Sequence, residues 1–161
     1  MFGPLKKWFG KEEKKELLAP VSGRVIPMKE VADPTFSQEI LGKGVAIVPT
    51  EGKIVAPASG VVQVMFETGH AVSIKTDLGA DIIVHVGLDT VNLKGQYFTP
   101  RVRQGDRVKA GDVLVEVELE KVKEAGYDVT TPVIVCDTPD HPDMVCHTGM
   151  EVKAQDPIIE L

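Results

Sequence analysis

Short runs of apolar, often β-branched residues recur from Leu17 to the end of the chain, separated by glycine, proline, asparagine or aspartate. Runs of this length and composition, bounded by turn residues, are typical of β-strands. Eight strands are predicted, over Val21–Pro27, Lys43–Pro49, Gly60–Phe66, His70–Lys75, Asp81–Leu88, Val113–Glu118, Pro132–Cys136 and Glu151–Lys153. The pattern therefore indicates an all-β fold, a sandwich or a barrel.

Helical signals are few and brief. Asp33-Pro34 is a good N-cap and first-turn pair, and with Gly42 as a stop it predicts a helix over Pro34–Leu41. A second helix is predicted over Glu118–Ala125, closed by Gly126. The fold is thus expected to carry two or three short helices.

The sequence also contains an internal repeat. The segment Leu18–Val25 and the segment Val55–Val62 both run through Ala-Pro-x-Ser-Gly into a strand. A third turn-then-strand unit, residues 102–114, is similar to segments of lipoyl and biotinyl carrier domains. Repeated hairpins of this kind predict an antiparallel sandwich with internal quasi-symmetry, a barrel-sandwich hybrid.

Residues 1–16 differ from the rest of the chain. Phe2, Leu5, Trp8 and Phe9 recur at helical spacing among five lysines. This pattern suits an amphipathic helix on an anionic membrane surface, or a flexible solvated tail, because so short a helix is marginal in water by itself. Both readings stay open, and residues 17–161 are expected to form one domain.

Composition and charge narrow the functional classes. The 161 residues are 43% hydrophobic and 26% charged, and no apolar stretch reaches the length of a membrane span. Residues 1–16 carry +2, so the remaining residues carry −8 of the total of −6. An acidic body argues against nucleic acid as a partner. Two cysteines and no export signal indicate free thiols in the cytoplasm.

His85 is the first candidate for chemistry. Strand alternation places Ile82, Val84 and Val86 on one face of its strand and Ile83 and His85 on the other. A lone histidine on such a strand is more often structural than functional. A second group is needed before a site can be inferred.

His70 supplies that second group if the two flanking strands form a hairpin around Thr76–Gly79. A four-residue loop places His70 directly opposite His85, and a two-residue Leu78-Gly79 turn places them diagonally on one face. A three-residue loop puts them on opposite faces, because a slip of one residue flips every side chain. Two of the three registers therefore make a histidine pair.

Two adjacent imidazoles suit phosphoryl transfer better than metal binding. One ring attacks phosphorus while its neighbour donates a hydrogen bond to the phosphoryl oxygens. Histidine keeps a neutral, nucleophilic fraction at cytoplasmic pH. Two histidines alone fall short of the three or four ligands of a usual zinc site.

The segments around both histidines resemble the glucose-class enzyme IIA (EIIA) proteins of the phosphoenolpyruvate-dependent sugar phosphotransferase system. Residues 84–95, Val-His-Val-Gly-Leu-Asp-Thr-Val-Asn-Leu-Lys-Gly, are similar to that family's active-site signature. Residues 66–71, Phe-Glu-Thr-Gly-His-Ala, match its second-histidine segment, and residues 18–23, 33–37 and 42–47 also fall in register. The resemblance runs from about residue 17 to the C-terminus, which corresponds to a type-1 EIIA domain.

The resemblance implies a phosphotransferase component with a phosphohistidine intermediate. His85 would accept the phosphoryl group from the phosphocarrier HPr and pass it to a cysteine of a sugar-specific EIIB domain. His70 would stabilise the phosphoryl group, Thr68 would orient His70, and the backbone carbonyl of Gly87 would hold His85. The protein would be a monomer that needs no cofactor. On family grounds a zinc ion bridging His70, His85 and a partner carboxylate stays open, as does binding to regulatory target proteins.

The resemblance also implies a docking surface for these partners. Asp33 and Asp89 match acidic positions at the rim of the family's site, and both also fit as caps of a helix or turn. An exposed apolar ring is expected around the histidines. Its members by family position are Phe36, Ile40, Leu41, Val45, Phe66 and Ile83.

Two other functions remain as alternatives. A biotinyl or lipoyl carrier module needs a lysine at the tip of a β-turn, for which Pro27-Met28-Lys29-Glu30 is the near candidate. A non-catalytic regulatory domain would bind partners without phosphoryl turnover. A cluster of Cys136, His141, Cys146 and His147 fits no common zinc-binding spacing.

Overall fold

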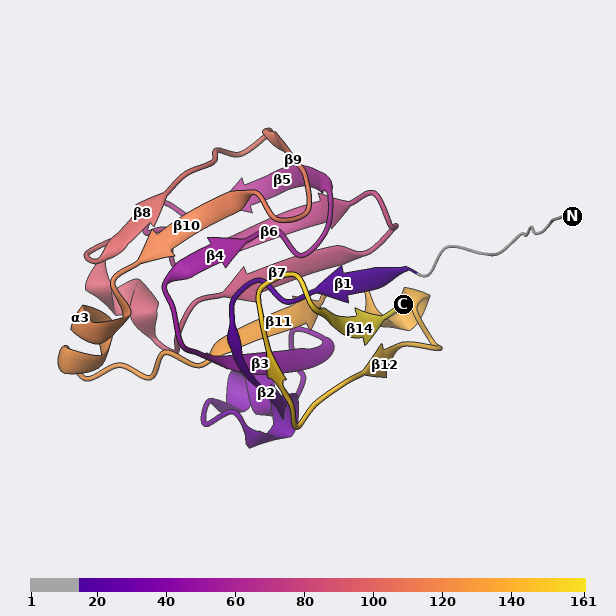
Figure 1. Ribbon diagram of the computed structural model, residues 1–161, viewed down its shortest axis with the longest axis horizontal. Coiled ribbons are helices and arrows are strands. Elements are labelled where there is room, and N and C mark those ends of the chain that lie inside the picture. Colours follow the sequence, from indigo (N-terminus) through magenta and orange to yellow (C-terminus); the bar gives the residue numbers. More distant parts are fainter. Residues whose placement is uncertain (1–14) are drawn as a thin grey trace, which may run out of the picture.

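The computed structural model describes residues 15–161, and it shows an antiparallel β-sandwich (Figure 1). The predicted amphipathic or flexible segment lies almost wholly outside the described residues. One eight-stranded sheet has the strand order β13-β2-β3-β11-β7-β6-β5-β9, and two three-stranded sheets have the orders β4-β10-β8 and β1-β14-β12. Every strand pair is antiparallel, so the predicted fold class is confirmed.

All eight predicted strands are present, with ends that differ by up to three residues. They are β2 (Gly23–Pro27), β3 (Lys43–Pro49), β5 (Gly60–Met65), β6 (Ala71–Thr76), β7 (Asp81–His85), β10 (Val113–Val117), β11 (Thr131–Val135) and β13 (Glu151–Val152). The sequence did not predict six further short strands, β1 (Glu16–Leu18), β4 (Lys53–Val55), β8 (Phe98–Pro100), β9 (Arg107–Val108), β12 (Val145–Cys146) and β14 (Pro157–Glu160).

The main core is the larger of two buried apolar clusters within residues 15–161, and it lies between the large sheet and the two small ones, which lie in front of the large sheet in Figure 1. Fully buried side chains come from all three sheets, including Ile47 and Ile74 from the large sheet and Leu114, Ile158 and Leu17 from the small ones. Burying a side chain of this size stabilises the fold by about 1.5–3 kcal/mol. Both small sheets are therefore integral to the sandwich.

The internal sequence repeat is also a repeat in the structure. The two Ala-Pro-x-Ser-Gly turns bond to each other, from Leu18 N–H to Pro57 C=O at 2.9 Å and from Val55 N–H to Pro20 C=O at 2.7 Å. Their serines make equivalent contacts, because the hydroxyl oxygen of Ser22 accepts from Ala154 N–H and that of Ser59 from Ala110 N–H, both at 3.0 Å. These matched bonds relate two halves of the sandwich by quasi-symmetry, as the repeat predicted.

The first helix is shorter than predicted. The helix α2 spans Pro34–Ser37, with the Asp33 carboxylate accepting the N–H of Thr35 at 2.9 Å as its N-cap. The chain leaves the helix at Gln38, and Glu39 has φ +58. The stop therefore comes before Gly42, because a residue in the left-handed region ends the helix.

The other helical elements are also short. The helix α3 spans Leu119–Glu124, within the predicted range, and three 3₁₀ helices were not predicted, η1 (Met28–Glu30), η2 (Thr90–Leu93) and η3 (Thr138–Asp140). Lys29 lies in η1, so it is not at the tip of a β-turn as a biotinyl or lipoyl lysine would be. No helix within residues 15–161 is long and apolar enough to cross a membrane.

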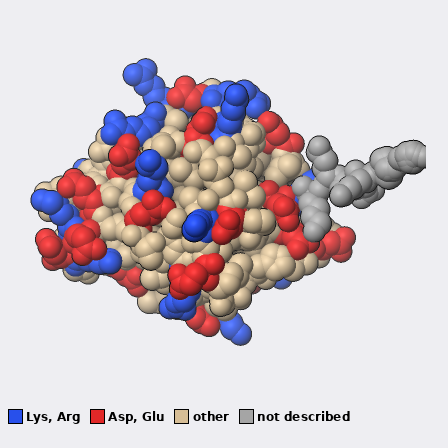
Figure 2. Space-filling model, viewed as in Figure 1, with Lys and Arg blue, Asp and Glu red and all other residues tan. Residues whose placement is uncertain are grey.

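Positive and negative side chains are interspersed on the face of the molecule seen in Figure 2. That face has no continuous basic patch of the kind that binds nucleic acid.

Candidate functional site

The structure brings the His70 and His85 rings together, but not in either of the two hairpin registers that were expected to pair them. Strands β6 and β7 pair Ala71 with His85, which is the register expected to place the two histidines on opposite faces. Their ring centroids are nevertheless 5.0 Å apart, with an angle of 80° between the rings. The two imidazoles therefore meet edge to face despite this register.

The explanation lies in the backbone before β6. Gly69 has φ +74, and His70 lies in a bend that ends where β6 begins at Ala71. Strand alternation does not extend into this bend, so His70 is not held on the core face with Val72. The carbonyl of His70 still accepts the N–H of Val86 at 2.7 Å, which ties the bend to the segment after His85.

The His85 ring is oriented by a backbone carbonyl. Its Nδ1–H donates to the carbonyl oxygen of Gly87 at 2.7 Å, so Nε2 is the unprotonated ring nitrogen in the neutral state. The same Gly87–Leu88 peptide is held on its other edge, because the N–H of Leu88 donates to the carbonyl of Asp128 at 2.9 Å. A chain of two hydrogen bonds thus fixes the ring from the loop before β11.

Gly87 is required at this position by conformation and by space. It has φ +79, and a Cβ there would lie 2.6 Å from Cγ2 of Thr90. Thr90 is fully buried, and its hydroxyl donates to the carbonyl of Val86 at 2.5 Å. The sequence did not identify Thr90 and Asp128 as site residues, because a threonine in a turn and a main-chain carbonyl carry no spacing signal.

His70 is buried and held by a neighbouring hydroxyl. Only 5% of the residue is exposed, and its Nδ1 hydrogen-bonds to the Thr68 hydroxyl. The Phe66 ring packs against it at a centroid distance of 5.3 Å. When the Thr68 hydroxyl donates, the proton of neutral His70 sits on Nε2, which is then available as a donor.

Both histidines favour the neutral state. Burial, followed by repulsion from His85, lowers the pKa of His70 from 6.5 to about 4. Burial also lowers the pKa of His85, partly offset by the Gly87 carbonyl and by the carboxylates of Asp33 and Asp89. At neutral pH the site therefore combines an imidazole with a free lone pair and an imidazole whose N–H can donate a hydrogen bond to an oxygen.

Asp33 and Asp89 flank the site, as their effect on the pKa of His85 shows. Asp33 is also the N-cap of α2, as expected. Asp89 precedes η2 in the left-handed region, with φ 59, and its side chain makes no cap hydrogen bond. The expected capping role of Asp89 is therefore wrong, and its carboxylate is free of that bond. A hollow of about 570 Å³ is lined by Asp33 and Asp89 together with Tyr127.

The expected apolar ring is only partly exposed. Ile40, Leu41 and Phe66 are 66%, 40% and 39% exposed. Val45 is fully buried and Phe36 is 5% exposed, so their expected place in an exposed ring is wrong. Val45 lies in the interior of β3 and belongs to the main core.

Ile83 and Phe36, which were also expected in the exposed ring, are both at least partly buried. Ile83 is half-buried on β7. Phe36 packs its ring 4.9 Å from that of His85, at an angle of 57°, and so covers the histidine instead of facing solvent. Val64 and Val91, which the sequence did not identify, are 38% and 48% exposed.

The histidines and cysteines near the C-terminus do not form a metal site. Within residues 15–161 no group of three or more histidine, cysteine or acidic side chains is arranged to hold a metal ion. His141 pairs with Asp137 at 3.2 Å, and His147 pairs with Glu160 at 2.6 Å. Partial desolvation is the main cause that raises the pKa of the Cys136 thiol and of the Cys146 thiol, which keeps both protonated.

Comparisons with known proteins agree with this fold. Residues 15–141 match the family of the phosphoenolpyruvate-dependent sugar phosphotransferase system, EIIA 1. The chain is 45% identical to the glucose-specific EIIA component of Halalkalibacterium halodurans over 140 residues, which cover 81% of each chain. It also resembles the glucose permease IIA from Mycoplasma capricolum, with a TM-score of 0.85 and 36% identity over 95% of this chain and 98% of that one.

Other relatives are longer proteins. The chain is 43% identical over 152 residues to the beta-glucoside-specific EIIBCA component of Halalkalibacterium halodurans, which covers 94% of this chain and 24% of that protein. The chain thus spans about a quarter of the length of such relatives. It belongs to the EIIA 1 family of the phosphoenolpyruvate-dependent sugar phosphotransferase system.

Proposed function

We propose that His85 is the phosphoryl-accepting residue and that a phosphohistidine at its Nε2 is the carrier intermediate. The observation that carries this proposal is the hydrogen bond from His85 Nδ1–H to the Gly87 carbonyl. It leaves the Nε2 lone pair free, and the lowered pKa of His85 keeps that lone pair unprotonated at neutral pH. A neutral imidazole fixed in one orientation is prepared for in-line attack on phosphorus.

Two transfers complete the cycle. In the first, the His85 Nε2 lone pair forms a bond to phosphorus, and the bond between phosphorus and its donor atom on phospho-HPr breaks. In the second, a cysteine thiolate of an EIIB domain attacks the same phosphorus, and the electrons of the P–Nε2 bond return to the His85 ring. Phosphoenolpyruvate supplies the phosphoryl group to HPr through enzyme I, so the balance needs no other cofactor. Both steps take place in the cytoplasm.

His70 stabilises the transferring group. Its Nε2–H, set by the Thr68 hydroxyl on Nδ1, donates to a phosphoryl oxygen as negative charge builds up there. Because a phosphoryl dianion beside it raises the pKa of a histidine, His70 binds the group more strongly once His85 is phosphorylated. The negative charges of Asp33 and Asp89 suit basic side chains on HPr or EIIB, which would dock around the exposed Ile40.

A zinc ion at the histidine pair is compatible with these rings but not with this chain alone. The Nε2 atoms of His70 and His85 have no hydrogen-bond partner among residues 15–161, so both can serve as ligands. Zinc prefers four ligands, and no third His, Cys, Asp or Glu of the described residues gathers with them. A partner carboxylate would have to complete the site, and a metal held there would block the nucleophile.

The test is phosphorylation with purified components. The protein is incubated with radiolabelled phosphoenolpyruvate, enzyme I and HPr, and we expect an acid-labile, base-stable label on the wild type. His85→Ala should carry none, while His70→Gln should accept phosphate but pass it on slowly to EIIB. Absence of label on the wild type, or its persistence in His85→Ala, would sink the assignment. Normal onward transfer by His70→Gln would restrict His70 to a structural role.

A further inference from the structure

A groove lies on the side of the molecule, between the loop that follows α2 and the segment that joins β11 to β12. Its volume is about 670 Å³, within the range of protein pockets that bind small ligands. Its apolar lining includes Ile40, Leu41, Pro139 and Met144. Ile40 and Leu41 are among the most exposed large apolar side chains of the described chain. Exposed apolar residues gathered in a hollow mark an interaction site.

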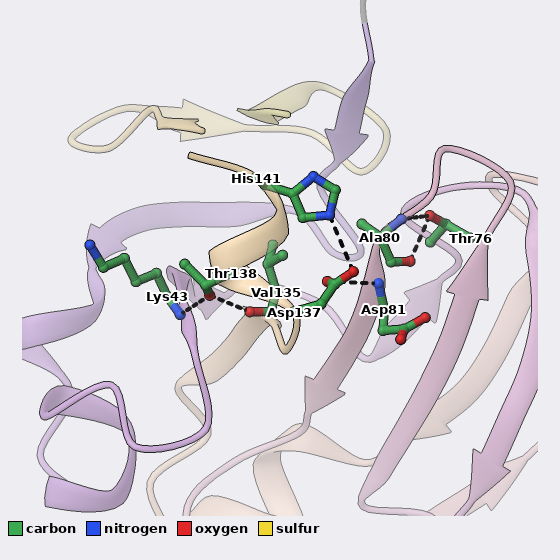
Figure 3. Close-up of polar contacts among 8 residues, drawn as sticks. All are labelled: Lys43, Thr76, Ala80, Asp81, Val135, Asp137, Thr138 and His141. Atoms are coloured by element: carbon green, nitrogen blue, oxygen red, sulfur yellow. Dashed lines mark hydrogen bonds and ion pairs between the residues drawn. The ribbon is translucent and has the colours of Figure 1, made fainter. Parts of the chain in front are cut away.

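The wall of this groove is held by polar contacts (Figure 3). The Thr138 hydroxyl donates to the carbonyl of Val135 at 2.6 Å and accepts the backbone N–H of Lys43 at 2.9 Å. The Asp137 carboxylate accepts the backbone N–H of Asp81 at 3.0 Å. These bonds tie the loop after β11 to the starts of β3 and β7. An occupant therefore meets a preformed surface, which lowers the entropic cost of docking.

The groove is continuous with the place where the described chain begins. Lys15 lines an adjoining hollow together with Asp140 and Asp143, and this hollow shares His141 and Pro142 with the groove. Residues 10–14 can span about 17 Å when extended. The chain that precedes them therefore starts within reach of the groove.

The composition of residues 2–9 matches that surface. Its apolar residues, Phe2, Leu5, Trp8 and Phe9, recur at helical spacing, and they are flanked by the lysines Lys6, Lys7, Lys11 and Lys14. Acidic side chains outnumber basic ones along the route. Glu39 lies in the groove with Lys43, and Asp140 and Asp143 lie in the adjoining hollow with Lys15. We propose that residues 2–9 of this chain dock in the groove and cover Ile40 and Leu41.

The docked segment would also affect partner binding, a consequence that rests on the proposed function. Ile40 and Leu41 belong both to the groove and to the surface proposed to meet HPr and EIIB. A docked N-terminal segment would compete with a partner for these two side chains. The segment would then act as an intramolecular competitor that a partner must displace. Because only undocked molecules could bind, the apparent affinity for the partner would be scaled by the undocked fraction.

The first test uses Trp8, the one tryptophan of the chain. We expect acrylamide to quench Trp8 fluorescence several-fold less in the full chain than in the Ile40→Ser/Leu41→Ser variant. Both replaced side chains are exposed, so the fold should survive. The matched control is Val64→Ser, which removes an apolar side chain that is 38% exposed outside the groove and should leave quenching at the wild-type level. High salt should weaken the protection, because it screens the lysines.

The second test locates the segment directly. Cys136 lines the groove and is exposed, so Phe9→Cys in a Cys146→Ser background should form a disulfide with Cys136 under mild oxidation. The cross-link should form within one chain at any protein concentration and should fail to form when Ile40→Ser/Leu41→Ser is added.

Three results would overturn the proposal. Equal quenching of Trp8 in wild type and groove variant would show that the segment does not dock. Protection that grows with protein concentration would indicate a second copy of the chain in the groove. Protection seen only with anionic phospholipid vesicles would assign the segment to a membrane surface. None of these readouts requires phosphoryl transfer, so they are independent of the proposed role of His85.

Discussion

Replacing His70 by glutamine should make the protein less sensitive to acid. His70 is buried against His85 and Phe66, and its pKa falls from 6.5 to about 4 on folding. The folded protein therefore resists protonating this ring, whereas the unfolded chain takes up the proton below pH 6.5. The stability that depends on neutral His70 is fully present above pH 6.5 and is lost as the pH falls toward 4.

The size of this effect follows from the two pKa values of His70. Each tenfold difference in proton affinity corresponds to about 1.4 kcal/mol, so a fall from 6.5 to about 4 amounts to about 3 kcal/mol when the transition is complete. Integrating the difference in bound protons gives a loss of about 2 kcal/mol between pH 7.5 and pH 5. Glutamine keeps a polar side chain of similar reach but does not titrate, so the variant should lack this loss.

The assay is urea unfolding of wild type and His70→Gln at pH 7.5 and at pH 5. Any constant effect of the substitution cancels when the differences at the two pH values are subtracted. We expect the variant to gain about 2 kcal/mol relative to wild type on going to pH 5. A second readout is the NMR titration of the His70 ring, with a midpoint well below 6.5. Equal pH dependence in the two proteins, or a midpoint near 6.5, would refute the argument from burial.

Three further substitutions probe the support of the two rings. Gly87→Ala places a Cβ 2.6 Å from Thr90 at φ +79, and it should cost about 1–3 kcal/mol of unfolding free energy and slow phosphorylation. Thr90→Val removes the hydroxyl bonded to the Val86 carbonyl, and calorimetry should show a loss of about 1–2 kcal/mol, whereas Thr90→Ser should retain the bond. Thr68→Val removes the hydroxyl on His70 Nδ1, and it should cost about 1–2 kcal/mol of unfolding free energy and slow rapid-quench transfer to EIIB about tenfold.

The longer strands could be predicted from sequence because each carries its own pattern. Lys43–Pro49 was predicted at its observed bounds, since a β-branched run between turn residues specifies a strand locally. The strands β9 and β12 have two residues each, too few for a period. They exist because neighbouring strands offer unpaired edges, which is a property of the tertiary fold.

The two histidines show that strand alternation does not apply to residues just outside a strand. Hairpin geometry correctly predicts that β6 and β7 pair, but alternation holds only inside a strand. The bend at Gly69 and His70 lies just outside β6, so His70 reaches the His85 side in a register that alternation alone would reject. Motif resemblance identified the pair because a motif records the outcome of such a bend without deriving it.

The buried and the exposed members of the apolar ring suit different roles, which their positions in the sequence could not show. Phe36 is nearly inaccessible to a partner, yet its ring lies 4.9 Å from that of His85. Burial is the main cause that lowers the pKa of His85, and an apolar ring against the imidazole contributes to that burial. Under the proposed function, Phe36 would serve the chemistry by keeping His85 neutral, whereas the exposed Ile40 and Leu41 would bind protein segments. A partner surface and a desolvating wall can both be apolar in sequence, and only the direction in which each side chain packs distinguishes them.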